Sequence, residues 1–239
     1  MLTDNSFFQI KETRGLSGYR SAWLYKDLEL GKYCLVGATE SVPYVFGDKD
    51  SFEFDILQSS TKGQIEGKPS LEPKDIEVLH HRDNAYRFGK MKGKIVDFMT
   101  INAEYVGYKY TGTLEYRPND AEADVNRATV TITPMSADAV PLYNARDEIA
   151  ETLCFASSIP ATLKVGDKFD LSVIQTTATA SYKMVKIGDN NVETEATTSL
   201  NSTNPKQASI SEAGLFAITV SDTAKIYASW TTTVYVEAV

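Results

Sequence analysis

The sequence is poor in the residues on which most protein chemistry depends. It has only two cysteines and two histidines among 239 residues. Cys34 and Cys154 lie far apart, and with no export signal we expect two reduced, buried thiols and no disulfide. His80 and His81 are adjacent, so on a strand they would point to opposite faces, which disfavours a shared metal ion. Both histidines are expected to serve packing or solvent contact.

Long apolar runs and basic patches are also lacking. No run approaches the roughly 18 residues that a membrane span needs. The first segment, MLTDNSFFQIKETRG, has no basic stretch followed by an apolar one, so no secretory signal is expected. The formal charge is −8, and both halves of the chain are mildly acidic. Stable binding to nucleic acid or to an anionic membrane normally needs a basic surface, so neither is expected as a lasting partner.

Catalytic motifs are missing as well. The sequence contains no GxGxxG, no GxxxxGK[ST], no HExxH and no nucleophile elbow. Residues 188–191 (GDNN) lack the glycine and the distal glutamate of a calcium loop and predict a turn. The carboxylate pairs Glu53/Asp55 and Asp75/Glu77 repeat at i, i+2 on strand-like segments, whereas a glycosidase needs two carboxyl groups facing each other across a cleft. We therefore expect a protein that is not an enzyme and holds no cofactor and no metal.

What the first half does contain is a strong β pattern. In residues 51–57 and again in 74–80, apolar residues alternate with carboxylates. A strand has period two, so each segment predicts a strand with an apolar core face and an acidic outer face. Residues 59–73 between them are rich in Ser, Gly, Lys and Pro and predict a loop longer than a hairpin needs. Loops of that length tend to carry a function.

The remainder of the first half predicts one short helix and three more strands. Ala85, Phe88 and Met91 form one apolar stripe, which predicts a helix over residues 83–91. The predicted strands follow at residues 95–101, 105–116 and 127–133.

Several tyrosines gather in or near the second of these strands, namely Tyr105, Tyr108, Tyr110 and Tyr116. Tyrosine is favoured both in strands and at protein interfaces, so we expect core or interface packing in preference to a ligand platform.

Composition changes at residues 137–150, where Ala, Asp, Pro, Asn and Arg replace β-branched residues, and we place a domain boundary close to Asn144. A short helix over residues 145–153 is an option. Beyond it, Thr, Ser and Val are abundant and turns recur every eight to twelve residues, which predicts a small β-sandwich. The strands are expected at residues 168–175, 181–187, 207–210, 215–220, 224–230 and 232–237.

Two features are difficult to explain in a monomer. One is the long loop, and the other is a strand face of carboxylates with no neighbouring basic residues to pair with them. If several copies close into a ring, edge strands become paired and the acidic faces can line the hole. Self-assembly is therefore the expected role.

The order of these parts resembles the major tail tube protein of long-tailed, siphovirus-like bacteriophages. The matching parts are the paired strands SFEFDILQ and KDIEVLHH joined by the loop SSTKGQIEGKPSLEP, then the short helix RDNAYRFGKMKG, followed by KIVDFMTI, EYVGYKYTGTLEY and NRATVTITPM, covering residues 15–135. The C-terminal half resembles a bacterial immunoglobulin-like domain, through IPATLKVGDKFDLSV, ISEAGLFAITV and KIYASWTTTVYVEA, while residues 182–204 depart from that pattern. The same combination of domains also occurs in this class of phage.

The resemblance implies a tail tube domain over residues 1–144, a β-barrel or sandwich with one short helix, and an immunoglobulin-like domain over residues 145–239. It implies hexameric rings stacked into a tube that conducts the genome on ejection, assembled in the host cytoplasm and located in the virion tail. Its partners would be copies of itself, the tape measure, terminator and distal tail proteins, and DNA in transit without stable binding. An acidic lumen would let a polyanion slide without sticking.

Candidate residues follow where the pattern matches. The lumen would be lined by Glu53, Asp55, Asp75 and Glu77, although the outer face is an alternative for each. The adjacent ring would be contacted by the loop residues Lys62, Gln64, Glu66 and Lys68.

Two other roles remain open. One is another tail or baseplate ring component of similar fold. The other is a binding module that holds a cell-surface glycan through the C-terminal domain and the tyrosine-rich strand.

Overall fold

The computed structural model describes residues 21–37, 39, 41–54, 63–102, 105–120, 126–138, 140–189, 192–196, 200–204 and 207–238, with the backbone alone for 49–54, 63–68 and 200–204. Within these residues the chain is mainly β, with several antiparallel sheets and one α-helix, as the sequence predicts. No helix in the described part of the chain is long and apolar enough to cross a membrane.

The N-terminal domain is built on a six-stranded sheet with the order β2-β1-β6-β7-β8-β5, in which every neighbouring pair is antiparallel. The strands are β1 Ala22–Lys26, β2 Tyr33–Leu35, β5 Lys74–Leu79, β6 Val96–Ile101, β7 Gly107–Pro118 and β8 Arg127–Ala137. The predictions of strands at 74–80, 95–101, 105–116 and 127–133 are confirmed to within a few residues. Strands β1 and β2 lie outside the sequence predictions.

Helix α3, Arg82–Met91, covers one face of this sheet and matches the predicted helix over 83–91. Its Phe88 is fully buried and stacks on Tyr116, while Trp23 of β1 packs on its other side. Alternate residues of β5 and β8, including Ile76 and Val130, complete the core beneath the helix. The opposite face of the sheet is apolar only near β1, β2 and β6, where residues 142–149 cover it.

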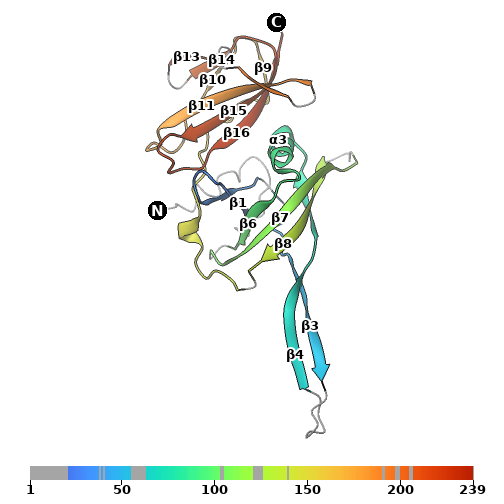
Figure 1. Cartoon of the computed structure of the whole chain (residues 1–239). Helices are drawn as coiled ribbons and strands as arrows, with labels where there is room; N and C mark the ends of the chain where they lie inside the picture. The colour runs from blue at the N-terminus through green and yellow to red at the C-terminus, as the bar shows by residue number, and fades with distance from the viewer. Residues whose placement is uncertain are drawn as a thin grey trace.

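Strands β3, Phe46–Phe54, and β4, Gly63–Leu71, pair with each other in a separate two-stranded sheet. This ribbon projects from the end of the N-terminal domain that faces away from the C-terminal domain (Figure 1). The prediction of a loop over residues 59–73 is therefore wrong for 63–71, which form a strand. The predicted pairing of 51–57 with 74–80 is wrong too, because β3 pairs with β4 and β5 pairs with β8.

The C-terminal domain consists of two sheets packed around one core. The strands are β9 Thr162–Lys164, β10 Lys168–Asp170, β11 Ala180–Ile187, β12 Glu193–Glu195, β13 Leu200–Asn204, β14 Gln207–Ile210, β15 Gly214–Asp222 and β16 Trp230–Glu237. One sheet has the order β10-β14-β13 and the other β12-β11-β15-β16-β9. Phe169, Met184, Phe216, Ile218 and Val234 are among the buried side chains between them.

Three predictions for this half are wrong, each because of a hydrogen bond that the local pattern does not encode. Residues 224–227 form a turn, because the Asp222 carboxylate accepts several of its backbone N–H groups, and only Trp230 of the predicted strand belongs to a strand, as the first residue of β16. The strand expected at 168–175 ends at Asp170, whose Oδ1 accepts the N–H of Ser172. The helix that the sequence left as an option at 145–153 is only a 3-10 turn, Arg146–Glu148, because the N–H of Ala150 is donated to the carbonyl of Tyr33.

Helix α3 also joins the two domains. Asp83, on its first turn, accepts hydrogen bonds from the Thr233 N–H at 2.8 Å and the Thr233 hydroxyl at 2.6 Å. One helical turn later, Arg87 donates to the carbonyl of Thr231 at 2.7 Å and lies over the ring of Trp230. Strand β9 pairs with β16 only from Tyr235 onward. Before that point, the Asp83 carboxylate accepts the N–H of Thr233 and Arg87 donates to the carbonyl of Thr231, as a neighbouring strand would otherwise do.

The chain between the domains is hydrogen-bonded on both sides. Ala150 donates to Tyr33 of the first domain, while Leu153 donates to Ala228 of the second. The N–H of Ala228 is donated back to the carbonyl of Glu151. This segment therefore behaves as part of the structure and does not resemble a free linker.

Candidate assembly surface

The β3–β4 ribbon is a two-stranded sheet separate from the other sheets of the described chain. No third strand joins it among the described residues. The outer N–H and C=O groups of such a ribbon are open to pairing with another chain, and an isolated two-stranded sheet is marginally stable in water. Its register pairs Phe52 with Ile65 and Glu53 with Gln64, so it places an apolar pair and a polar pair at successive positions. The ribbon is therefore suited to contact a neighbouring molecule.

The base of the ribbon is fixed to the N-terminal domain by close packing. Phe46 is buried in the core beneath α3. A Cβ atom at Gly47 would overlap the side chains of Ser70 and Glu72, so these two side chains pack directly over the backbone of the glycine. The hydroxyl of Ser70 also donates to the carbonyl of Asp48 at 3.2 Å. The direction in which the ribbon leaves the domain is thus set by the fold.

A tyrosine cluster, defined here as Tyr44, Tyr108 and Tyr143, lies at this base. The ring centroid of Tyr44 lies 5.4 Å from that of Phe46 and 5.5 Å from that of Tyr108, the latter edge to face. Burial raises the pKa of the Tyr108 phenol, with further contributions from the phenols of Tyr44 and Tyr143. Tyr44 and Tyr108 are therefore in ring contact, and Tyr143 lies close by, next to Leu142, which pairs with Gly107.

Much of the tyrosine cluster is exposed. Tyr44 is 55% exposed and Tyr143 is 78% exposed. Val140, close to Tyr143 in the sequence, is 72% exposed. Large apolar side chains that gather on a surface indicate an interaction site, and tyrosine is enriched in such sites. Sequence reasoning singled out Tyr108 but not Tyr44 or Tyr143, because positions this far apart in the chain carry no local signal of their proximity.

Asp75 and Glu77 lie on the outer face of β5, as the alternating pattern predicts, with Ile76 and Val78 buried between them. The expectation that no basic residue pairs with these carboxylates is wrong. Glu77 forms an ion pair with Arg127 at 3.1 Å, and Asp75 accepts a hydrogen bond of 2.6 Å from the Thr131 hydroxyl. Both partners come from β8, the strand beside β5.

The same face continues across β8 and β7 as a polar surface. Arg127, Thr129, Thr131 and Thr133 alternate with buried residues on β8, and Glu115 lies beside Thr131 on β7. Glu115 is paired with Lys92 at 3.0 Å. This face is therefore rich in hydroxyl groups, and its carboxylates are largely balanced by cations.

The other predicted lumen and stacking residues fall on the ribbon or outside the described residues. Glu53 lies on β3, in a different sheet from Asp75 and Glu77. Asp55 and Lys62 lie outside the described residues. Gln64, Glu66 and Lys68 lie on β4 and not in a loop. Within one chain, Glu53 and the β5 carboxylates do not share a sheet face.

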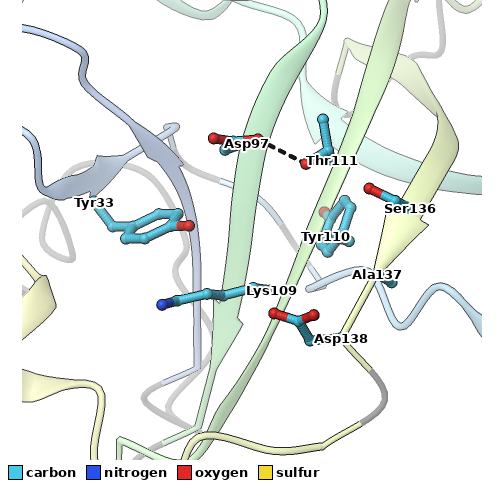
Figure 2. Close-up of a pocket in the computed structure, with 8 residues that line it drawn as sticks. All are labelled: Tyr33, Asp97, Lys109, Tyr110, Thr111, Ser136, Ala137 and Asp138. Carbon is cyan, nitrogen blue, oxygen red and sulfur yellow. Dashed lines mark hydrogen bonds between the residues drawn. The ribbon is translucent and has the colours of Figure 1, made fainter.

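A polar hollow of about 230 Å³ opens where β6, β7 and β8 meet (Figure 2). Asp97 accepts a hydrogen bond of 2.6 Å from the Thr111 hydroxyl, and Lys109 forms an ion pair with Glu148 at 2.5 Å. Burial, followed by the nearby Asp97 carboxylate, raises the pKa of Tyr33 to about 12, so its phenol stays protonated. Lys109 and Asp97 thus both have partners within the chain, which suits a structural role.

The two histidines have structural partners. His81 caps α3 by accepting the Asn84 N–H through Nδ1, and His80 shares a 2.7 Å hydrogen bond with the Tyr116 hydroxyl. In the described ranges no three His, Cys, Asp or Glu residues come together as a metal site would require.

Both cysteines are free thiols; Cys34 is buried as predicted, whereas Cys154 is only partly buried. Burial raises the pKa of Cys34 to about 12 and that of Cys154 to about 11.

Comparisons with known proteins add no family: no protein-family model and no curated protein matches the chain.

Proposed function

We propose that the chain is a structural protein that assembles with copies of itself into stacked rings, forming the tail tube of a siphovirus-like bacteriophage. The proposal rests on the sequence resemblance and on one feature of the fold. That feature is the β3–β4 ribbon, which projects from the N-terminal domain with two open edges and carries the exposed tyrosine cluster at its base.

The ribbon and the cluster supply two different kinds of contact. Open strand edges provide directional backbone hydrogen bonds, and the tyrosines provide apolar area with polar tips. The ribbon lies at the end of the molecule away from the C-terminal domain (Figure 1), and the cluster adjoins its base through the contact of Tyr44 with Phe46. In a stack of rings, this end would contact the next ring and leave the C-terminal domain, with its proposed immunoglobulin-like fold, to project from the tube.

The polar face of β5, β8 and β7 is the surface that we assign to the passage of DNA. An acidic surface repels phosphates, but the carboxylates of this face are bonded to Arg127, Lys92 and Thr131. Charge repulsion therefore contributes little to keeping DNA from binding here. The row Thr129, Thr131 and Thr133 offers hydroxyls and no charge. A surface without an excess of Lys and Arg lacks the phosphate contacts that hold DNA, so DNA would slide over it.

Negative-stain electron microscopy of the purified chain tests this function. A tube subunit forms hollow filaments, or stacks of rings, at raised protein concentration. Single closed rings that never stack would favour another tail or baseplate ring component. Monomers under every condition, including in the presence of other tail proteins, would contradict the proposal.

A matched pair of variants connects the assembly to the proposed surface. Tyr44→Ser combined with Tyr143→Ser removes the exposed part of the tyrosine cluster and should abolish or shorten the filaments. Ile226→Ser removes an exposed apolar side chain from the C-terminal domain, where Ile226 is 60% exposed. Filaments of equal length in both variants would exclude the tyrosine cluster from the contact.

A further inference from the structure

A pocket of about 370 Å³ lies on the seam between the two domains. Helix α3 contributes Arg82, Tyr86, Gly89 and Lys90 to it, and the five-stranded sheet contributes Ile187 and Leu215. Arg82, Tyr86 and Gly89 follow one another at intervals of four and three, and Lys90 lies four residues after Tyr86, so these residues form one face of α3. Ligand pockets favour domain interfaces and begin at roughly 300 Å³, so both place and size suit a small molecule.

Gly89 is unexplained by the packing of the chain itself. It lies inside α3, where glycine destabilises a helix relative to alanine. A Cβ atom built on Gly89 would meet nothing within 4 Å, so no neighbouring atom of the described chain requires a glycine there. Glycine does leave the helix backbone bare at the pocket wall, which allows a bound molecule to approach it closely.

The charged groups of the pocket leave a cation in excess. Glu193, its one lining carboxylate, forms an ion pair with Lys90 and accepts a 3.0 Å hydrogen bond from the Tyr86 hydroxyl. Burial works to raise the pKa of Glu193, but the bonds from Lys90 and Tyr86 and the charge of Lys183 hold it below its usual value. The other cation is Arg82, which uses Nη1 to bind the carbonyl of Ala161 at 2.9 Å. A guanidinium has five N–H donors, so Arg82 can also bind an anion.

Apart from Thr233, whose hydroxyl donates to Asp83, the rest of the lining is apolar or aromatic. Ile187 and Leu215 come from paired positions on β11 and β15, so they form a continuous apolar surface. The Tyr86 ring comes from the helix side of the pocket. A cation together with apolar and aromatic side chains fits a molecule that combines an acidic head with a flat or short hydrophobic body.

We propose that this interdomain pocket binds a small organic anion with an aromatic or short aliphatic body. The acidic head binds Arg82, and the body lies beside the bare backbone of Gly89, between Tyr86 and Leu215. Because the ligand touches both domains, binding stabilises their docked arrangement. This site is independent of the ribbon and of self-assembly.

Saturation-transfer NMR and calorimetric titration of the full chain with three matched probes test the proposal. Phenylacetate carries the anionic head, benzyl alcohol is neutral, and benzylamine is cationic. We expect saturable binding of phenylacetate below about 10 mM, and at least about tenfold weaker binding of the other two, since a charge-assisted hydrogen bond is lost. No saturable binding of phenylacetate, or equal binding of all three probes, would overturn the proposal.

Two variants and a control locate the site. Gly89→Leu fills the pocket while keeping a good helix former, so it should abolish phenylacetate binding. Arg82→Gln should remove the preference for the anion. Lys94→Leu changes an exposed residue outside the pocket and should bind as the unmodified chain does. Circular dichroism confirms that each variant is folded, and unchanged affinity of a folded Gly89→Leu variant would refute this location.

Discussion

Replacing Asp83 by alanine should loosen the contact between the two domains. Asp83 is only 6% exposed and accepts hydrogen bonds from the Thr233 N–H at 2.8 Å, the Thr233 hydroxyl at 2.6 Å and the Thr232 hydroxyl at 3.2 Å. Alanine would leave the Thr233 N–H without this acceptor at a buried site. The helix would keep its length and its Arg87 contacts with Thr231 and Trp230, but its first turn would lose this attachment to β16.

The size of the effect follows from these bonds. A hydrogen bond to a charged group contributes about 1.5–3 kcal/mol, and an unsatisfied buried N–H costs about 1–3 kcal/mol. These terms overlap, and part is offset because alanine no longer requires a buried charge to be desolvated. We expect a loss of about 2–3 kcal/mol for Asp83→Ala. Asp83→Asn keeps an oxygen that can accept from Thr233 and should lose about 1 kcal/mol.

Differential scanning calorimetry measures this loss, and small-angle X-ray scattering measures the separation of the domains. A loss of about 2–3 kcal/mol lowers Tm by roughly 4–12 °C in a protein of this size. The control is Asp75→Ala, which removes an exposed carboxylate with one bond to Thr131 and should change stability by less than about 0.5 kcal/mol. If Asp83→Ala unfolds at the same temperature as the control, with the same radius of gyration, the reasoning about this contact is wrong.

Three further predictions concern stability and reactivity. Burial works to raise the pKa of Asp222, but backbone N–H donors, among them that of Ile226, hold it below the ordinary value of 3.8. The ionised Asp222 carboxylate therefore stabilises the folded chain above about pH 4, and this contribution is lost as the pH falls through its lower folded pKa. The free energy of unfolding of Asp222→Asn should accordingly depend less on pH in this range than that of the unmodified chain. Cys34 and Cys154, with pKa values raised to about 12 and about 11, should resist alkylation by iodoacetamide at pH 8 until the chain is unfolded; mass spectrometry that finds rapid native labelling would contradict their burial. Gly107→Ala places a methyl group against the backbone carbonyl of Thr100, so it should unfold at least about 1 kcal/mol more easily, and equal stability in urea would show that the strand can shift to accept it.

How far the sequence predicts this fold depends on the range of the interactions involved. Strand β5 and helix α3 were predicted nearly to the residue, because each carries a clear hydrophobic period. Strand β14 matches its predicted bounds, Gln207–Ile210. The sequence of β4 predicts a loop because Gly, Lys, Pro and Ser have low strand propensity. Its pairing with β3 overrides that propensity.

The candidate sites depend on contacts between distant parts of the chain, which a single sequence does not reveal. Tyr44 and Tyr108 meet only because the sheet brings the ribbon base to β7. Asp83 reads as an ordinary acidic residue at the start of a helix, and its bond to Thr233 spans 150 positions. The outward position of Glu77 was predictable from period two, whereas its partner Arg127 was not, since strand pairing is set by tertiary structure.

Sedimentation of the purified chain over a concentration series, with and without the ribbon, tests the central claim of self-assembly most directly. In the comparison variant, an Asn-Gly turn replaces residues 50–68 and closes β3 onto β4 next to the Lys49–Pro69 pair. The account predicts that the full chain forms large assemblies as its concentration rises, while the shortened chain keeps its melting temperature and stays monomeric. Equal sedimentation of the two proteins at every concentration would contradict it.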